Sequence, residues 1–403
     1  MDSDPAPGPL GYLFERFPSF TQTFCAREVA ALRRAGVECP VFSIRDPRGE
    51  PLRQPFEGLG ETTYLPASFD DRIAGDTRFR REARAAQADL RALWGDESEK
   101  HRIYESLWLE RACAGRGVKH LHAHFAGIAA RTAFWLRRRG GPTYSVTAHA
   151  NDIFRDEPPE RLAQILESAS FVVTVSDFSR RFLTEKFPQI ESRLHRVYNG
   201  IQTGLFVRSD FPPGRPLIVA VGRTIEKKGF EDLVAACALL PDIDFECQII
   251  GGGPLDETLN SQVEAAGLGH RVVVAGPKSE DEIKAVLARA RVFALPCITA
   301  PDGAMDNLPT VIVEAMAAGL PVISTPVAGI PEMVEDSVSG FLVPERSPEA
   351  LAPRLRELLS NATLARQMGE AGRLRCRRLF DIATTSGELL ALFQRYGALA
   401  ATD

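Results

Sequence analysis

The sequence has few cysteines, and their spacing does not indicate that any of them act as a pair. The seven cysteines are scattered along the chain, and none stands in a Cys-x-x-Cys or other metal-ligand spacing. This pattern is typical of reduced, mostly buried thiols rather than of a disulfide scaffold or a zinc module. It therefore favours a cytoplasmic compartment.

The sequence also lacks a membrane-spanning run, a leader and an excess of basic charge. No stretch approaches the roughly 20 apolar residues that a membrane-spanning helix needs. The chain starts with MDSDPAPGPLGYLF, in which no basic segment precedes an apolar run, so we expect no signal peptide. The net charge of -5 gives no support to nucleic-acid binding. We therefore expect a soluble, cytoplasmic protein with no nucleic-acid partner.

What the sequence does contain is a regular alternation of short apolar runs with amphipathic helical patterns. A chain of 403 residues exceeds the size of most single-core domains, so we expect two domains. The alternation predicts the α/β class, with two doubly wound parallel-sheet domains facing a cleft. The expected strands are 10–14, 39–44, 120–124, 144–148, 171–175 and 194–197 in the first half, and 217–221, 244–250, 272–275, 292–295, 322–324 and 340–343 in the second.

A polar, proline-rich segment at residues 206–216 interrupts this alternation. Few periodic contacts could cross such a segment, so we interpret it as a linker. We expect an N-terminal domain at 1–207, a C-terminal domain at 208–378, and a helical segment at 379–403 that packs back on the first domain. Ligands of open parallel sheets bind at the C-terminal ends of strands, so we expect the site in the cleft.

The segment from about residue 70 to 100 is helical, charged and rich in arginine. Its cluster Arg78, Arg80, Arg81 and Arg84 could meet anionic lipid head groups or an acidic acceptor. The protein would then be peripheral at the inner face of the membrane. Acidic residues are interleaved with these arginines, which favours a solvated helix face instead.

Two acids stand close to a predicted helix start in DNLPTVIVEAMAAGLP, at Asp306 and Glu314. Proline favours the first turn of a helix and glycine the position past its end, so we predict a helix from about Pro309 to Ala318. Its N-terminus would offer unpaired N–H groups to an anion. Each acid could be an ordinary surface residue. Together they could hold hydroxyl groups on either side of a bound diphosphate.

Two loops that follow predicted strands carry groups suited to phosphate. Arg223 and Lys228 follow the strand 217–221, where a guanidinium fork and an ammonium group could converge on a diphosphate. The next strand ends in three glycines, 251–253, which would let a phosphate or a base approach the backbone. A tight turn without a ligand is the alternative. The G-x-G-x-x-G dinucleotide pattern fails, because Asp256 stands where its third glycine should be.

Three of the histidines in or after predicted strands are candidates for the site or the core. His149 follows a strand, with Asp152 three residues later, and its imidazole could contact a sugar hydroxyl or transfer a proton; a structural histidine is the alternative. His122 and His124 share one face of their strand. Because no further ligand stands at metal-site spacing, we expect them to line the cleft or pack in the core. Polar side chains of the loop 16–24 either face the cleft or cap a helix.

Taken together, these motifs resemble glycosyltransferase family 4, whose members have the two-domain, Rossmann-like GT-B fold. The resemblance spans nearly the whole chain, and the N-terminal half is most similar to members that build exopolysaccharides such as colanic acid. The matching segments are FPSFTQTF (17–24), HAHF (122–125), TAHANDI (147–153), VSDFSRRFL (175–183), NGI (199–201), VGRTIEKKG (221–229), GGGP (251–254), the acid pair with its helix (306–319), and VISTPVAGIPEMV (322–334) with GFLV (340–343).

The resemblance implies a retaining transfer of a hexosyl or related sugar from a nucleotide-diphospho-sugar to a hydroxyl of a glycan, a lipid-linked or a small-molecule acceptor. It implies no metal and no resident cofactor, and a UDP- or GDP-linked donor rather than an ADP-linked one. In such a reaction negative charge builds on the leaving diphosphate, which fixed cations and a helix N-terminus would stabilise. A front-face substitution is our working hypothesis.

Carried over residue by residue, the resemblance divides the candidate residues into three groups. The catalytic group would be His149 at the donor sugar, Arg223 and Lys228 at the diphosphate, and Asp306 at a sugar hydroxyl. The donor-binding group would be Glu314, which would hold the ribose, with Asn307, Leu308, Pro309, Thr310, Gly222, Gly252 and Lys278. The acceptor-binding group would be Thr21, Gln22 and Thr23.

Four positions depart from the family pattern. Asp306 and Gln22 stand where Glu is usual, Asn307 where Gly is common, and Gln202 where Asp is frequent. These departures bear on the donor sugar and the acceptor more than on the reaction class. The alternative functions are a GT-B nucleotide-sugar epimerase or phosphorylase, or a non-catalytic nucleotide-sugar-binding protein. An active enzyme is favoured because both cations and both acids are present.

Overall fold

The computed structural model describes residues 8–19, 22–47, 58–66, 77–95, 99–207 and 211–400. The chain divides into two compact units. The first comprises Met1–Val175, Arg180–Val197 and Ser386–Asp403, and the second comprises Ser176–Ser179 and Tyr198–Thr385. We expected the boundary between residues 207 and 208 and the returning segment from 379. The chain instead passes into the second unit after Val197 and returns to the first at Ser386.

The first unit is built on a seven-stranded sheet in the order β3-β2-β1-β4-β5-β6-β7, and every neighbouring pair is parallel. Parallel neighbours need crossover connections, which helices supply here. The strands are β1 (Leu10–Arg16), β2 (Val41–Arg45), β3 (Thr62–Tyr64), β4 (His120–His124), β5 (Thr143–Ala148), β6 (Val172–Thr174) and β7 (Leu194–Arg196). The helices are α1 (Thr23–Arg34), α3 (Thr77–Trp94), α4 (Lys100–Gly115), α5 (Ile128–Arg138), α6 (Asn151–Phe154), α7 (Pro159–Ser168), α8 (Asp177–Lys186) and α16 (Ile382–Arg395), of which α8 and α16 begin in the second unit.

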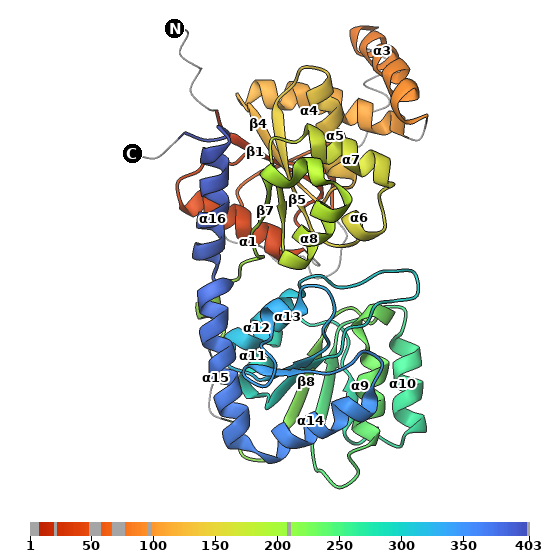
Figure 1. The fold of residues 1–403 in the computed structure, drawn as a ribbon, viewed down its shortest axis with the longest axis vertical. Coiled ribbons are helices and arrows are strands. Elements are labelled where there is room, and N and C mark those ends of the chain that lie inside the picture. The colour runs from red at the N-terminus through yellow and green to blue at the C-terminus, as the bar shows by residue number, and fades with distance from the viewer. Residues whose placement is uncertain are drawn as a thin grey trace. The chain divides into compact units, whose positions relative to one another are not determined.

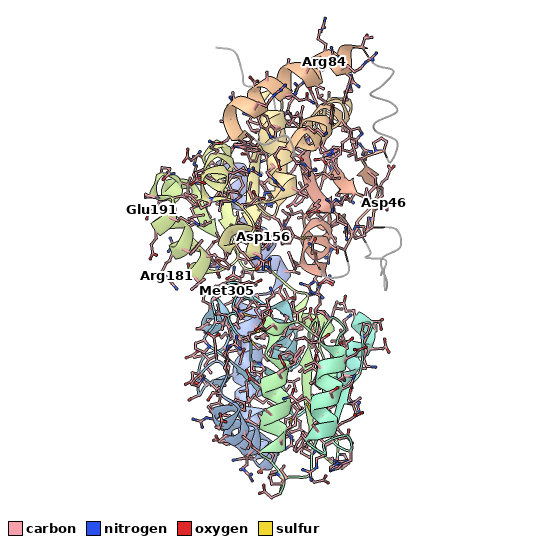
Figure 2. The ribbon with its side chains drawn as sticks, turned by 90° about the vertical axis from the view of Figure 1, so that its right-hand side faces the viewer. Asp46, Arg84, Asp156, Arg181, Glu191 and Met305 are labelled. Carbon is pink, nitrogen blue, oxygen red and sulfur yellow. The ribbon has the colours of Figure 1, made fainter. Side chains whose placement is uncertain are left out.

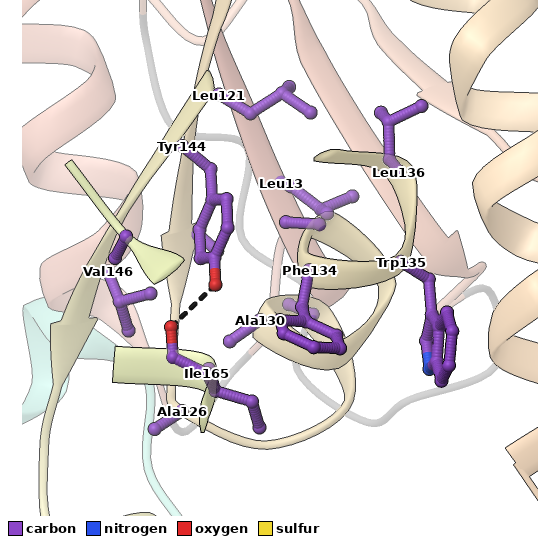
Figure 3. Packing of buried hydrophobic residues seen from close by; sticks show 14 of the residues in the cluster. Leu13, Leu121, Ala126, Ala130, Phe134, Trp135, Leu136, Tyr144, Val146 and Ile165 are labelled. Atoms are coloured by element: carbon purple, nitrogen blue, oxygen red, sulfur yellow. Dashed lines mark hydrogen bonds between the residues drawn. The ribbon is translucent and has the colours of Figure 1, made fainter. Parts of the chain in front are cut away.

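One face of this sheet carries an aliphatic and aromatic core. Alternate residues of a strand face opposite sides, and Leu13 and Leu121 belong to the buried cluster on this side together with Phe134 and Trp135 of α5 (Figure 3). Tyr144 Oη donates a hydrogen bond of 2.5 Å to the carbonyl oxygen of Ile165 in α7. The buried phenol therefore has a partner, as a polar group in an apolar core requires.

The opposite face of the same sheet packs against α1 and α16 (Figure 1). Tyr12 of β1 and Phe171 meet Phe393 of α16, with ring centroids 6.5 and 5.6 Å apart. The C-terminal segment thus completes the core of the first unit. The histidines of β4 also lie on this side, where the ring of Tyr12 contacts those of His122 and His124.

The second unit is built on a six-stranded parallel sheet in the order β10-β9-β8-β11-β12-β13. Its strands are β8 (Leu217–Val221), β9 (Glu246–Ile250), β10 (Val272–Val274), β11 (Val292–Leu295), β12 (Val322–Ser324) and β13 (Gly340–Leu342). Its helices are α9 (Phe230–Ala238), α10 (Asp256–Ala265), α11 (Glu280–Arg289), α12 (Thr310–Ala317), α13 (Ile330–Met333), α14 (Pro348–Ser360) and α15 (Ala362–Leu379). The strand order reverses between β8 and β11, and ligands of doubly wound sheets bind at such a point.

The predicted α/β class with two doubly wound sheets is confirmed. All twelve expected strands are present, with ends within about two residues of the predicted ones. The seven cysteines are free and buried, as expected. Among the described residues, no helix is long and apolar enough to cross a membrane. The strand β3 was not predicted.

Candidate functional site

Two lysines and one aspartate form an ion-pair cluster at the C-terminal end of the second sheet. Lys227 and Lys228 lie in a short 3-10 helix after β8, and Asp306 lies in the loop between β11 and α12. The Oδ1 atom of Asp306 is 2.7 Å from Nζ of Lys227, and its Oδ2 atom contacts Nζ of Lys228. Because β8 and β11 are neighbours in the sheet, the loops that follow them meet here.

The lysines keep Asp306 ionised. Burial would raise the pKa of Asp306, but the Lys228 and Lys227 ammonium groups outweigh it and lower that pKa to about 2. Burial would likewise lower the pKa of Lys228, but Asp306 raises it above its ordinary value. Two lysines share one carboxylate, and the exposed Arg223 lies in the same loop. Three cations thus lie in the loop after β8, and two of them pair with Asp306.

The backbone of the loops after β8 and β9 packs too closely to admit side chains. Gly251 has a φ of +148°, and a Cβ atom there would lie 1.8 Å from the Gly222 carbonyl oxygen. A Cβ atom on Gly222 would lie 3.1 Å from Cε of Lys228, so the lysine stem covers this glycine. Asp256, which breaks the dinucleotide pattern, instead accepts a hydrogen bond from the Thr224 hydroxyl. The turn thus presents bare backbone at the end of two strands, where a phosphate can approach closely.

The side chain of Asn307 fixes the loop that leads to α12. Its Oδ1 atom accepts a hydrogen bond of 2.6 Å from the Ser176 hydroxyl, and its Nδ2 atom donates one of 2.7 Å to the Ser179 hydroxyl. Its carbonyl oxygen accepts a hydrogen bond of 3.0 Å from the Gly329 N–H group. All of these residues belong to the second unit. Asn307, which stands where glycine is common in the family pattern, therefore holds this loop in place through contacts within the second unit.

The predicted helix after the first acid is α12, which begins at Thr310 and ends at Ala317. Pro309 is its N-cap residue and makes no side-chain capping bond. The first N–H groups of a helix have no partner within the helix, so this end suits an anion. Leu308 is buried before the helix, and Glu314 is buried within it. The prediction that Glu314 is a surface acid, which was the alternative, is therefore wrong.

Two further groups of candidate residues lie apart from this cluster in the sequence. Lys278 precedes α11, and its Nζ atom is 3.9 Å from Oε1 of Glu282. Gln22 is the N-cap residue of α1 without a side-chain capping bond, and Thr23 is the first residue of the helix. Thr21 lies outside the described residues. The roles expected for these residues stay predictions.

The loop after β5 holds His149 between aromatic rings. The ring centroids of Phe24 and Phe125 are 4.9 and 4.3 Å from that of His149. Phe125 has a φ of +68°, which is unusual for a residue with a side chain and typical of strained functional sites. Asp152 turns back and accepts hydrogen bonds from the N–H groups of His149, Ala150 and, at 2.8 Å, Ala126 of the neighbouring loop. The hydrogen bonds to Asp152 therefore hold this loop, and with it His149, in a fixed position.

The histidines of β4 form a ladder with hydroxyl groups of β5. The hydroxyl of Ser145 lies 2.8 Å from Nε2 of His120 and 2.8 Å from Nδ1 of His122. Nε2 of His122 lies 2.8 Å from the Thr147 hydroxyl. Burial lowers the pKa of His120 to about 3 and that of His122 well below its ordinary value, so both rings are neutral. All three histidines of β4 are buried, and for His122 and His124 the core was one of the two positions expected.

One oxygen and two ring nitrogens come close enough to consider a metal ion. The carboxylate of Glu28 and one nitrogen each of His122 and His124 lie within 4.8 Å of one another. However, both ring nitrogens of His122 contact hydroxyl groups, and Nε2 of His124 lies 3.0 Å from Oε1 of Glu28. Hydrogen bonds thus account for the arrangement, and we describe these residues as a hydrogen-bond network.

Sequence reasoning missed two residues of these clusters. Lys227 stands beside Lys228 in the same motif, but only Lys228 was predicted to be a site residue. Glu28 lies 96 residues from its partner His124. No local spacing could have connected them, although a lone acid among the apolar residues of α1 was a signal.

Two family models match consecutive parts of the chain. The model for Glycosyltransferase Family 4 matches residues 21–205, and that for Glycosyl transferases group 1 matches residues 203–375. The putative colanic acid biosynthesis glycosyltransferase WcaL of Escherichia coli is 44% identical over 368 residues, which cover 86% of this chain and 89% of that protein. The Salmonella typhimurium protein of the same name is 31% identical over 375 residues, which cover 86% of this chain and 90% of that one.

The solved structures agree on the fold. The Anabaena protein HepE in complex with UDP has a TM-score of 0.73 and 17% sequence identity, and the match covers 96% of this chain and 100% of that protein. This likeness confirms the GT-B fold. Because the match to WcaL covers most of both sequences, the chain belongs to glycosyltransferase family 4, in the colanic-acid type, and is a glycosyltransferase.

Proposed function

We propose that the chain transfers a sugar from a UDP- or GDP-linked donor to a hydroxyl group of a glycan or lipid-linked acceptor, without a metal ion. The single observation that carries this proposal is the Lys227–Lys228–Asp306 cluster at the C-terminal end of β8. A departing nucleoside diphosphate carries negative charge that something must stabilise. Fixed cations in a partly buried site serve this purpose well, because their charges need no reorganisation during the reaction.

Lys228 and Arg223 would bind the diphosphate in this proposal. The stem of Lys228 lies over Gly222, so its ammonium group stands beside the bare backbone of the glycine loops. Asp306 holds that ammonium group in place, and would contact a donor hydroxyl with its remaining acceptor capacity. The roles of the second acid and of the helix are those that the family resemblance implies. Glu314 would hold the ribose diol, and the N-terminus of α12 would face phosphate or sugar.

In this proposal the protein mainly positions the donor and the acceptor and stabilises the negative charge of the leaving diphosphate. The acceptor hydroxyl attacks the anomeric carbon from the face that the diphosphate leaves, which retains the configuration. The leaving phosphate oxygen takes the proton of the acceptor, so no side-chain nucleophile is needed. A trapped glycosyl-enzyme intermediate would contradict this scheme.

The proposal is tested by following nucleoside diphosphate release and product formation. The purified protein is mixed with UDP-, GDP- and ADP-hexoses, with and without a panel of glycan and lipid-linked acceptors, in buffer containing EDTA. We expect diphosphate release that requires an acceptor, persists with EDTA, and favours a uridine or guanosine donor. Binding of the matching diphosphate should also raise thermal stability, by about 2.7 kcal/mol at 100 times its Kd.

The alternatives give different results in the same assay. An epimerase converts the donor without any acceptor, a phosphorylase requires free phosphate, and a non-catalytic protein binds donor without turnover. The variant Glu314→Gln should weaken donor binding about tenfold, because one hydrogen bond to a charged group is lost. The exposed Glu349→Gln in α14 is the matched control and should bind as the unmodified protein does.

We also propose that the arginines of α3 bring the protein to an anionic membrane surface. Arg80, Arg81 and Arg84 are exposed, and the Arg84 side chain projects away from the helix (Figure 2). Oε2 of the acidic neighbour Glu82 lies 3.8 Å from Nη2 of Arg139, which follows α5, so Glu82 does not cancel these charges fully. A solvated helix face is the alternative.

Vesicle sedimentation separates these two interpretations of α3. Vesicles containing an anionic phospholipid should bind the protein at low salt, and vesicles of neutral phospholipid should not. Each arginine near the surface is worth about 1 kcal/mol, so changing Arg80, Arg81 and Arg84 to Gln should weaken binding by at least tenfold. Equal sedimentation of both proteins would leave α3 as a solvated helix.

A further inference from the structure

A line of buried polar side chains runs from β1 to His149 in the first unit. The Tyr12 hydroxyl donates a hydrogen bond of 2.8 Å to Oε1 of Glu28, and the same oxygen lies 3.0 Å from Nε2 of His124. On the other side of that ring, Nδ1 of His124 lies 3.1 Å from Nε2 of His149. His124 is fully buried, and Glu28 is 17% exposed. The line therefore joins an ionisable carboxylate to the histidine after β5 through a single imidazole.

The chemistry of these groups fixes the direction of most of the hydrogen bonds. An ionised carboxylate can only accept, so both Tyr12 and Nε2–H of His124 donate to Glu28. The remaining question is whether Nδ1 of His124 also carries a proton. If it does, it donates to Nε2 of His149, and the proton of His149 must then sit on Nδ1. If it does not, His149 donates through Nε2 and leaves its own Nδ1 as an acceptor.

The charges around His124 favour the doubly protonated ring. Burial would lower the pKa of His124, but Cys25 and Glu28 outweigh it and raise that pKa to about 10. The Cys25 sulfur lies 3.6 Å from Nδ1 of His124, and Oε1 of Glu28 lies 3.0 Å from its Nε2 atom. Burial and the neighbouring His124 lower the pKa of His149 well below its ordinary value.

The remaining neighbours of His124 do not change this assignment. His122 beside it in β4 is neutral, with ring centroids 5.2 Å apart. Tyr12 approaches from β1, and burial raises the pKa of its hydroxyl, so it stays a donor. The ring of Phe14 stacks on His124 with centroids 5.2 Å apart. An imidazolium with one carboxylate partner therefore faces a neutral histidine.

We propose that Glu28 and His124 are positioning residues that hold His149 neutral, with its Nε2 atom accepting from His124 and its proton on Nδ1. This inference rests on the proposed function, in which His149 acts at the donor sugar. It gives that role a definite chemical form. In this state His149 offers an N–H group, so it donates a hydrogen bond to a sugar oxygen and does not act as a general base.

Nuclear magnetic resonance of the unmodified protein tests the proposal without any variant. The chain has seven histidines, so selective ¹⁵N-histidine labelling gives a tractable spectrum, and long-range couplings report which ring nitrogen carries the proton. The signals of His124 and His149 are assigned by their loss in His124→Gln and His149→Gln. We expect His124 to be doubly protonated and His149 to be the Nδ1–H tautomer at pH 7. A His149 found as the Nε2–H tautomer would overturn the proposal.

The variant Glu28→Gln links the tautomer to activity. An amide keeps an acceptor near Nε2 of His124 but removes the charge that holds the second proton. We expect His124 to lose that proton, His149 to switch to the Nε2–H tautomer, and kcat to fall by about 10- to 100-fold with little change in donor KM. The control Glu38→Gln removes an exposed carboxylate of the same unit and should change neither spectrum nor rate.

The outcomes separate this inference from the proposed function. Glycosyl transfer with a His149 tautomer that does not respond to Glu28→Gln would reject the relay alone. The expected tautomers without any glycosyl transfer would reject the function alone. Metal analysis closes the remaining alternative, since stoichiometric zinc in the purified protein would replace the relay with a metal site.

Discussion

Replacing Lys228 by alanine should lower kcat by at least about a hundredfold, with a much smaller change in overall stability. The ammonium group of Lys228 is the cation that Asp306 fixes beside the glycine loops, and one such preorganised group is typically worth about 3 kcal/mol in the transition state. Single-turnover rates of diphosphate release measure this loss directly. Activity close to that of the unmodified protein would contradict the assigned role.

The neighbouring lysine is a matched control for this experiment. Lys227 and Lys228 are each 12% exposed, and both pair with Asp306. Lys227, however, also donates to the carbonyl oxygen of Met305, and its own carbonyl oxygen accepts from the Ile298 N–H group, so it ties two loops together. We expect Lys227→Ala to lower stability and to reduce kcat less than tenfold. Equal losses in the two variants would mean that both lysines only shape the loop.

The neutral His120 should contribute less to the stability of the first unit as the pH falls. The folded state holds His120 neutral with a pKa of about 3, whereas an unfolded histidine has a pKa of about 6.5. The contribution of His120 is therefore complete above pH 6.5 and falls by about 1.4 kcal/mol for each pH unit below it, until the folded pKa is reached. Between pH 7 and pH 5 the loss is about 2 kcal/mol, and the neutral His122 adds to it.

Tryptophan fluorescence can follow this loss in the first unit alone. All three tryptophans, at positions 94, 108 and 135, belong to that unit. The free energy of urea unfolding is measured at pH 7 and pH 5. The change between the two pH values in His120→Asn should differ from that in the unmodified protein by about 2 kcal/mol, in the direction that favours the variant at pH 5. The exposed His101→Asn of α4 serves as the control. An unchanged pH dependence in His120→Asn would show that His120 can take up a proton in the folded state.

Most of the fold was predictable from the sequence because parallel strands are buried on both faces. Runs such as Leu217–Val221 are apolar at every position and stand out against amphipathic helices. The strand β3 (Thr62–Tyr64) escaped because its three residues are half-buried and contain no aliphatic side chain. The residues at which the chain passes from one unit to the other were also predicted several residues away from their observed positions. A boundary between units depends on contacts between distant segments.

The candidate site was predictable where chain order alone brings residues together. Loops that follow neighbouring parallel strands must meet, which placed Lys228 and Asp306 at one edge of the sheet. The partner of each side chain could not be predicted in this way. Consecutive residues of a 3-10 helix point in different directions, yet the long stems of Lys227 and Lys228 both reach the same carboxylate. Glu28 meets His124 only through the packing of α1 on the sheet.

Because the chain returns to its first unit only at Ser386, the core of that unit is completed late in synthesis. Leu389 and Phe393 belong to the same buried cluster as Tyr12, so that core stays open until these two residues have left the ribosome. Translation of the long insertion Tyr198–Thr385 takes roughly 10 to 40 s at usual rates. During this delay the part of the first sheet's face that α16 covers in the folded protein is exposed. The nascent chain thus exposes an apolar surface to chaperones for far longer than a domain built from one continuous segment does.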